Sequence, residues 1–127
     1  MGGALRLALA AEGEPTFVVR VEPEDGAAGV LRDSPVLLRL SRRVDPGSVS
    51  VEALEIRDPS GPVPTHVELS PDGFVLILRP RRLFAPDLEH VVLVSGLRDR
   101  TGRQVAAHRS RFAPCGLSGA DLLTVLE

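Results

Sequence analysis

Hydrophobic and polar residues alternate along most of the chain, in short runs that end at Pro or Gly. In the clearest run, Val-Leu-Leu-Arg-Leu, the first, third and fifth residues face one way: Val36, Leu38 and Leu40. The intervening Leu37 and Arg39 face the other way. A period of two is typical of a β-strand with one face in a core. The Asp-Pro-Gly turn that follows makes it hard for this strand to continue.

The same pattern predicts seven short strands, at residues 16–21, 36–40, 51–57, 63–69, 74–79, 89–95 and 104–112. Pro62 and Pro64 cannot donate hydrogen bonds to a ladder, which places 63–69 at a sheet edge. Residues 24–30 and 80–87 are predicted loops. Seven short strands with turn signals between them favour a β-sandwich.

The last residues, 118–127, follow a different pattern. Ser118 is a candidate N-cap, and Leu122, Leu123 and Leu126 recur at helical spacing on one face. A short C-terminal helix is therefore predicted. So short a helix is marginal alone, which means that it must dock on something.

The chain divides into three parts: an N-terminal segment (1–15), a sandwich (16–114) and a tail (115–127). In the first part Leu5, Leu7 and Leu9 alternate, as an added edge strand would. The apolar run 5–11 also fits the end of a signal peptide, although a complete one needs a charged start and a longer apolar stretch. Both interpretations stay open.

Composition narrows the class of protein. The 127 residues suit one domain, and 43% hydrophobic residues are enough for a core. The net charge is −2, all basic residues are Arg, and Trp and Tyr are absent. Nucleic-acid binding is disfavoured because it usually combines basic surfaces with stacking aromatics. No stretch is long enough to span a bilayer.

Turns and strands also follow one another in a recognisable order. The landmarks are residues 23–30 (Pro-Glu-Asp-Gly-Ala-Ala-Gly-Val), 33–36, 40–46, 70–73, 76–80, 84–86 and 92–97, then Asp99, Gly102 and Phe112. Over about residues 17–113, this order resembles the bacterial immunoglobulin-like domain of the SbsA S-layer type.

The resemblance implies an immunoglobulin-like sandwich that serves as a spacer or adhesion module in the cell envelope or outside the cell. It carries over no catalytic residues and no cofactor. The chain departs from the family at Leu40, where Phe is common, and at His90, where Tyr is common. Such a Tyr is a corner residue that bonds the backbone. His90 could make the same bond while half-buried, or it could have a ligand-binding or catalytic role.

Several aliphatic residues are predicted to point away from the core, together with the leucines of the tail. These candidate interface residues are Leu37, Val75, Ile77, Val91, Leu93, Leu122, Leu123 and Leu126. If several gathered on one sheet, they would form a patch that monomers rarely expose. Either the tail or the N-terminal segment covers them, or they contact a protein partner or a second copy of the chain.

Other chemistry has weak support. His66, His90, His108 and Cys115 lack the close paired spacing of metal ligands. Cys115 is the single cysteine, so an internal disulfide is excluded; it is either a half-buried small hydrophobe or a reactive thiol. No phosphate loop, dinucleotide fingerprint or nucleophile elbow is present.

The sequence thus predicts an all-β, immunoglobulin-like antiparallel sandwich of about seven strands with a short C-terminal helix. The expected function is a non-catalytic structural or interaction module without cofactors, part of a larger envelope-associated or extracellular assembly. The alternative is an adhesin-type module that binds carbohydrate or another surface ligand, although the lack of Trp and Tyr speaks against a sugar platform.

Overall fold

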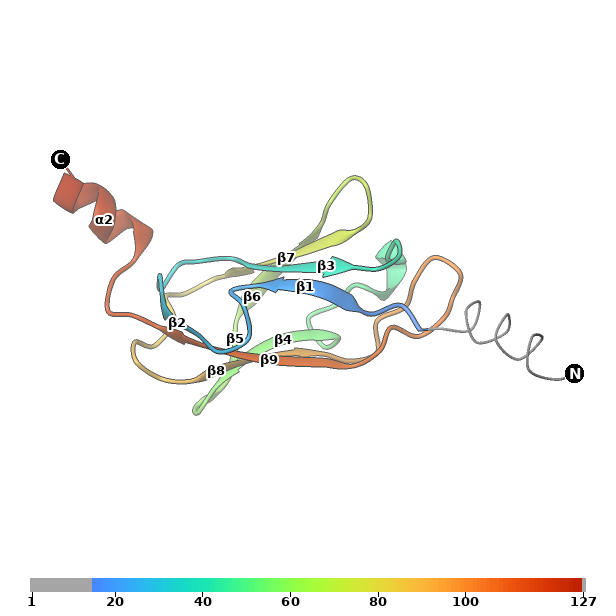
Figure 1. Ribbon diagram of the computed structural model, residues 1–127, viewed down its shortest axis with the longest axis horizontal. Helices are drawn as coiled ribbons and strands as arrows, with labels where there is room; N and C mark the ends of the chain where they lie inside the picture. The colour runs from blue at the N-terminus through green and yellow to red at the C-terminus, as the bar shows by residue number, and fades with distance from the viewer. Residues whose placement is uncertain (1–14, 127) are drawn as a thin grey trace, which may run out of the picture.

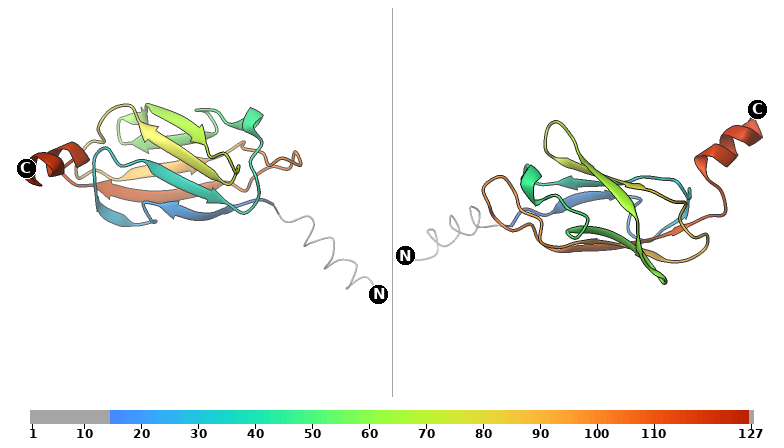
Figure 2. Two further views of the ribbon diagram at one scale, coloured as in Figure 1. Left: turned by 90° about the horizontal axis from the view of Figure 1, so that it is seen from above. Right: turned by 180° about the vertical axis from the view of Figure 1, so that it is seen from behind.

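The computed structural model describes residues 15–126, with side chains described as far as Leu123. It is a sandwich of two β-sheets packed face to face (Figures 1 and 2). The four-stranded sheet has the order β1 (Val18–Glu22), β3 (Val36–Leu40), β7 (Val75–Pro80) and β6 (Thr65–Leu69). The five-stranded sheet has the order β2 (Ala27–Val30), β9 (His108–Pro114), β8 (His90–Val94), β4 (Leu54–Asp58) and β5 (Gly61–Val63). The predicted all-β sandwich is confirmed.

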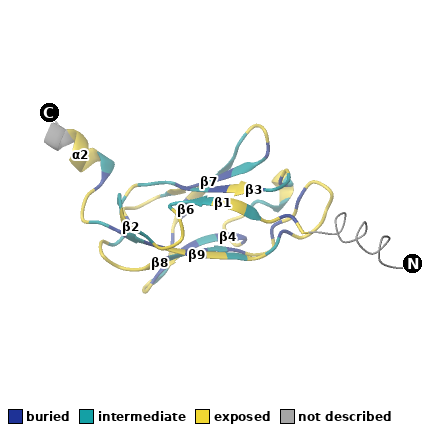
Figure 3. Ribbon diagram, viewed as in Figure 1, coloured by how far each residue is buried: buried dark blue, intermediate teal, exposed yellow. Residues whose placement is uncertain are grey.

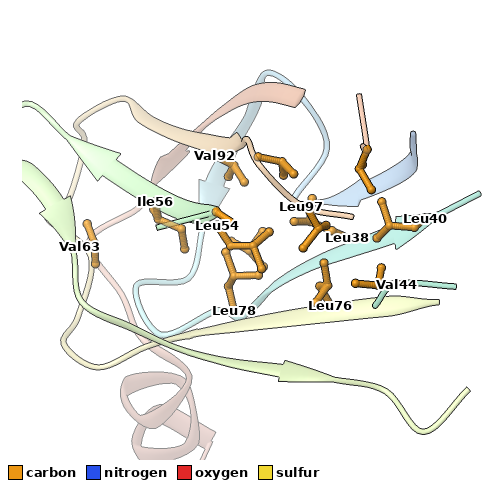
Figure 4. Close-up of a cluster of buried hydrophobic side chains, with 14 of the residues drawn as sticks. Leu38, Leu40, Val44, Leu54, Ile56, Val63, Leu76, Leu78, Val92 and Leu97 are labelled. Carbon is orange, nitrogen blue, oxygen red and sulfur yellow. The ribbon is translucent and has the colours of Figure 1, made fainter. Parts of the chain in front are cut away.

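The core lies between the sheets and follows the predicted alternation. In β3 the side chains of Val36, Leu38 and Leu40 are buried, whereas Leu37 is half-buried and Arg39 exposed. Inward side chains of the other inner strands meet them, as Figure 4 shows for Leu54, Ile56, Leu76, Leu78 and Val92. Removing this apolar surface from water is the main stabilising contribution to such a fold.

The predicted loop at 24–30 is wrong in its second half. Residues Ala27–Val30 form β2, which pairs in parallel with β9. The amide of Gly26 donates to Arg111 O at 2.7 Å, and the amide of Cys115 donates to Val30 O at 2.7 Å. The positive φ of Gly29, 69°, lets the chain bend within this short strand. Its Gly and Ala residues carry no alternating pattern, so the sequence did not reveal it.

The predicted single strand 63–69 is two strands that belong to different sheets. β5 pairs with β4, and β6 pairs with β7. Pro64, which has no amide hydrogen, lies between them where the chain crosses from one sheet to the other. The predicted edge position is confirmed, because β5 and β6 each lie at the edge of their sheet.

Most of the other strands begin one to four residues later than predicted; β1 begins at Val18 rather than residue 16, and the shift is largest in β4 and β9. β4 starts at Leu54 rather than residue 51, since residues 51–53 form a turn in which Ala53 N donates to Ser50 Oγ at 3.1 Å. β9 starts at His108 rather than residue 104; before it, Val105 forms only an isolated bridge with Thr16. The described part of the chain therefore has nine strands rather than about seven, and one of their pairings is parallel.

The chain ends in the predicted short helix, α2 (Gly119–Leu126), which projects from one end of the sandwich (Figures 1 and 2). Among the described residues, no helix has the length and apolar character needed to cross a membrane. The N-terminal segment, with its predicted strand or signal-peptide remnant, lies outside the described residues except for Pro15.

Two neighbouring leucines of β3 test the inward assignment. Leu38→Ala should lower the free energy of unfolding by about 2–5 kcal/mol, because it leaves a cavity in a closed core. Leu37→Ala removes a half-buried side chain from the outer face and should cost about 1 kcal/mol. Equilibrium unfolding in urea measures both, and equal losses would contradict the assignment.

Candidate functional site

Three of the predicted interface residues lie together on the outer face of the four-stranded sheet. Leu37 of β3 is opposite Ile77 of β7, and Val75 is two residues before Ile77. All three side chains are half-buried. Glu22 pairs with Leu37 on one side, and Glu68 pairs with Ile77 on the other. The aliphatic group is therefore small and bordered by carboxylates.

Val91 and Leu93 lie on the opposite outer face, that of the five-stranded sheet. Val91 pairs with Arg57 and Arg111 in the neighbouring strands. Both aliphatic residues line a shallow hollow of about 390 Å³ together with Arg109 and other charged side chains. The five outward aliphatic residues are thus divided between two faces, and they form no continuous patch.

The tail leucines lie on α2, away from both faces. Leu122 and Leu123 are 37% and 66% exposed, and exposed residues dominate the helix in Figure 3. Leu126 is the last described residue of the helix, but its side chain is outside the described part. Because α2 projects beyond the end of the sandwich, it does not cover the outward aliphatic residues (Figures 1 and 2).

The start of α2 is fixed by a capping box. Ser118 Oγ accepts a hydrogen bond from Asp121 N at 3.2 Å, and Asp121 Oδ2 accepts one from Ser118 N at 2.8 Å. These contacts hold the pKa of Asp121 below its ordinary value, through the Ser118 amide first and its hydroxyl second. Asp33 also accepts from Gly119 N at 2.7 Å. The first turn is therefore tied to the domain.

At the same end of the sandwich, His90 is completely buried rather than half-buried. Its Nδ1 lies 2.8 Å from Leu88 O, and since a carbonyl only accepts, Nδ1 carries the proton. This is the predicted bond to the backbone. The ring packs between Phe84 and Phe112, with centroid distances of 5.1 and 5.2 Å. His90 is therefore part of the packed core at this end of the sandwich.

The other nitrogen of His90 faces a carboxylate. Nε2 lies 4.0 Å from Asp58 Oδ2 and has no hydrogen-bond partner among residues 15–126. Asp58 Oδ1 accepts from Ser60 N at 2.8 Å, and Arg82 lies 3.5 Å from Oδ2 at the surface. The carboxylate is thus held by Ser60 and Arg82, the imidazole is held by Leu88, and both side chains are almost completely buried.

The remaining candidate ligands lie apart. In the described part of the chain, no three His, Cys, Asp or Glu side chains gather in a way that could hold a metal ion. His66 lies 3.5 Å from Glu68, and His108 Nε2 lies 3.1 Å from the hydroxyl of the buried Ser110. Cys115 is half-buried, and its sulfur accepts from Leu117 N at 3.4 Å.

At the opposite end of the sandwich, Asp99 connects the loop between β8 and β9 to the start of the chain. Its carboxylate accepts hydrogen bonds from Thr16 Oγ1 at 2.6 Å, Thr101 Oγ1 at 2.6 Å, Thr101 N at 2.9 Å and Arg103 N at 3.1 Å. Burial alone would raise the pKa of Asp99, but these bonds outweigh it and lower the pKa to about 2. The sequence placed Asp99 in a turn, and its bond to Thr16 could not be inferred from spacing.

Three loops border an open hollow of about 440 Å³, which is lined by Ser41, Arg42, Arg43, Phe74, Asp99, Arg100 and Thr101. We call it the arginine hollow. The sequence did not reveal it because Arg100 is far in the chain from Arg42 and Arg43. Arg79, Arg81 and Arg82 are close together in the sequence. The positive charge of this group is partly neutralised, since Arg79 lies 3.4 Å from Glu68 and Arg82 lies 3.5 Å from Asp58.

Comparison with known proteins supports the fold. Neither a protein-family description nor a curated protein matches the sequence. Among solved structures, the S-layer protein rSbsC(31-844) is similar over 88% of this chain and 15% of its own, with 15% identity and a TM-score of 0.67. CopC from Methylosinus trichosporium OB3b is similar over 79% of this chain and 93% of its own, with 20% identity and a TM-score of 0.66. An L,D-transpeptidase from Mycobacterium smegmatis is similar over 80% of this chain and 41% of its own, with 21% identity and a TM-score of 0.56.

These similarities support the predicted S-layer-like, immunoglobulin-type fold. Membership of the SbsA type in particular stays a prediction. The chain spans only about 15% of the S-layer protein, so the similarity is to one part of a longer molecule. At identities this low, what is shared is the fold, and function is a separate question.

The Asp99 contacts predict a pH dependence. Asp99→Asn should lower the free energy of unfolding by about 1–3 kcal/mol at pH 7, because the amide cannot accept all the bonds of the carboxylate. The pKa of Asp99 is lowered from its ordinary value of 3.8 to about 2, so its contribution is present above pH 3.8 and lost as the pH falls towards 2. Urea unfolding of both proteins between pH 7 and pH 2 should show the difference shrinking, and a constant difference would contradict the role.

Proposed function

We propose that this chain is a non-catalytic protein-interaction module, a structural or accessory part of a larger assembly in the cell envelope or outside the cell. The observation that carries the proposal is α2, which projects from the sandwich with Leu122 and Leu123 exposed. The fold similarity to one part of an S-layer protein agrees with this role.

The geometry of α2 favours a partner. The helix has eight residues, a length that is marginal in water without tertiary packing. Its capping box and the bond to Asp33 hold the first turn, whereas the leucines beyond that turn face solvent. Packing these leucines against another chain would remove apolar surface from water, at about 25 cal/mol per Å² before association costs.

The outer faces of the sheets offer secondary contacts. Leu37, Val75 and Ile77 on one face, and Val91 and Leu93 on the other, are each surrounded by charged residues. An aliphatic centre with a polar rim is typical of protein interfaces. Each group is small, so we expect it to extend an interface that α2 initiates.

Several observations favour a non-catalytic role, although some proteins that share the fold are L,D-transpeptidases. Ser110 and His108 are within hydrogen-bond distance, but Ser110 is 2% exposed, so its hydroxyl faces the core. Nucleophilic catalysis needs a nucleophile that a substrate can reach. Asp58 and His90 are likewise enclosed.

The role of α2 is tested by light scattering behind size exclusion, on the full chain and on a chain stopped at Gly116. We expect the full chain to self-associate and the truncated chain to be monomeric, because the exposed leucines are removed with the helix. The double variant Leu122→Asp/Leu123→Asp should also be monomeric, since two carboxylates oppose burial in an apolar contact.

Val51→Asp is the matched control, because Val51 is 61% exposed but belongs to the sandwich rather than to α2. It should leave the association unchanged. If both full and truncated chains are monomeric and the truncated chain is less stable, α2 completes the domain and the proposal is wrong for the helix.

A further inference from the structure

The arginine hollow lies at the end of the sandwich opposite α2, so its role is independent of the proposed interface. The loops that form it are rigidly connected. Arg100 N donates to Arg43 O at 3.0 Å, and Val44 N donates to Gly73 O at 2.9 Å. Val44 is itself completely buried, which anchors the loop after β3. The hollow is therefore shaped by the fold rather than by mobile side chains alone.

Aromatic packing on Phe74 orients the guanidinium group of Arg43, which lines the hollow, and that of Arg39, which lies over the same ring. Arg39 and Arg43 both lie over the ring of Phe74, with Cζ 5.6 and 5.7 Å from the ring centroid. Such cation–π contacts hold a guanidinium in place while leaving its N–H groups available. Arg43 also packs its aliphatic stem against Gly73, where a Cβ would lie 3.4 Å from it. A held arginine loses less conformational freedom when it binds a ligand.

The positive charge here is only partly compensated. Within residues 15–126, no carboxylate lies within ion-pairing distance of Arg39, Arg43 or Arg100. One carboxylate, that of Asp99, does line the hollow, and its lowered pKa keeps it negatively charged at neutral pH. It is buried, and it accepts hydrogen bonds from Thr16, Thr101 and Arg103. It therefore offsets one of the three arginines in the lining, Arg42, Arg43 and Arg100.

Asp72 is the second carboxylate near the hollow. Its pKa is lowered, first by the Ser70 hydroxyl and the Phe74 amide, with smaller contributions from Arg39 and Arg43. Asp72 is fully exposed, so its charge is screened by water.

We propose that the arginine hollow binds a doubly charged oxyanion, phosphate or sulfate, either as the free ion or as a small organic ester. Planar guanidinium groups match the oxygens of such anions and bind them by charge-assisted hydrogen bonds. Its volume, about 440 Å³, is within the range of small-molecule sites and leaves room for a group attached to the anion. The alternative function in the sequence analysis is a module that binds a surface ligand. The arginine hollow would be the binding site for such a ligand.

A second hollow of similar size provides the matched control. It holds about 390 Å³ on the outer face of the five-stranded sheet, and its arginines Arg57 and Arg109 are accompanied by the carboxylates of Asp58 and Glu89. Its two arginines are balanced by two carboxylates, whereas the arginine hollow has three arginines and one carboxylate, so the control hollow should not bind a divalent anion. Removing two arginines there changes the net charge of the protein as much as removing two from the arginine hollow.

The test is calorimetric titration of the full chain with inorganic phosphate, sulfate, glucose 6-phosphate and glucose at constant ionic strength. The wild type should bind the three anions and not glucose. Arg43→Gln/Arg100→Gln should weaken anion binding by at least roughly tenfold, since each charge-assisted bond contributes about that factor. Arg57→Gln/Arg109→Gln should bind as the wild type does. Arg100→Gln alone changes an exposed side chain, so it reports on binding even if the double variant folds poorly.

Amide chemical shifts recorded during the titration locate the site. Changes centred on Arg43, Arg100 and Thr101 support the proposal. Tighter binding of the sugar phosphate than of inorganic phosphate identifies the ester as the ligand, and equal binding identifies the free anion. The proposal would be overturned if phosphate and sulfate bound no more strongly than chloride, or if the two double variants weakened anion binding equally. Because α2 is untouched, this result does not depend on the self-association of the chain.

Discussion

The apolar side chains between the two sheets hold every other feature in position. β3 lies inside the four-stranded sheet, between β1 and β7, and sends Val36, Leu38 and Leu40 into the core. Opposite them, β4 and β8 contribute Leu54, Ile56 and Val92. Because the two sheets cover this apolar layer from both sides, the loops at either end of the sandwich can carry polar and charged groups without destabilising the core.

Each end of that core is closed by a buried carboxylate, but in a different way. Asp99 binds hydroxyl and amide donors from segments up to 83 residues apart, so it joins loops to one another. Asp58 faces His90, and Arg82 contacts it from the surface, so it joins β4 to the loop between β7 and β8. The arginine hollow forms beside the first carboxylate, and α2 emerges near the second end, which separates the two proposed contacts by the length of the sandwich.

Local alternation was enough to predict the inner strands, because each inward residue is decided by its immediate neighbours. It predicted the inward sets of β3, β7 and β8. The backbone bond of His90 was expected only from the family resemblance. It could not predict β2, whose Ala and Gly residues have no contrast in polarity, or the change of sheet at Pro64. The arginine hollow also escaped, since Arg43 and Arg100 meet only after three loops have been brought together. Contacts between residues that are far apart in the sequence depend on the topology of the fold, and the spacing of residues along the chain does not reveal that topology.

The described chain enters the sandwich at the end that carries the loop between β8 and β9, and it leaves at the other end through α2 (Figure 1). Domains of this form can therefore be joined in series without the polypeptide turning back. A pull along the long axis would act on β1 and β9, which run along that axis in different sheets. The hydrogen bonds of their ladders would then be loaded together in shear rather than opened one after another.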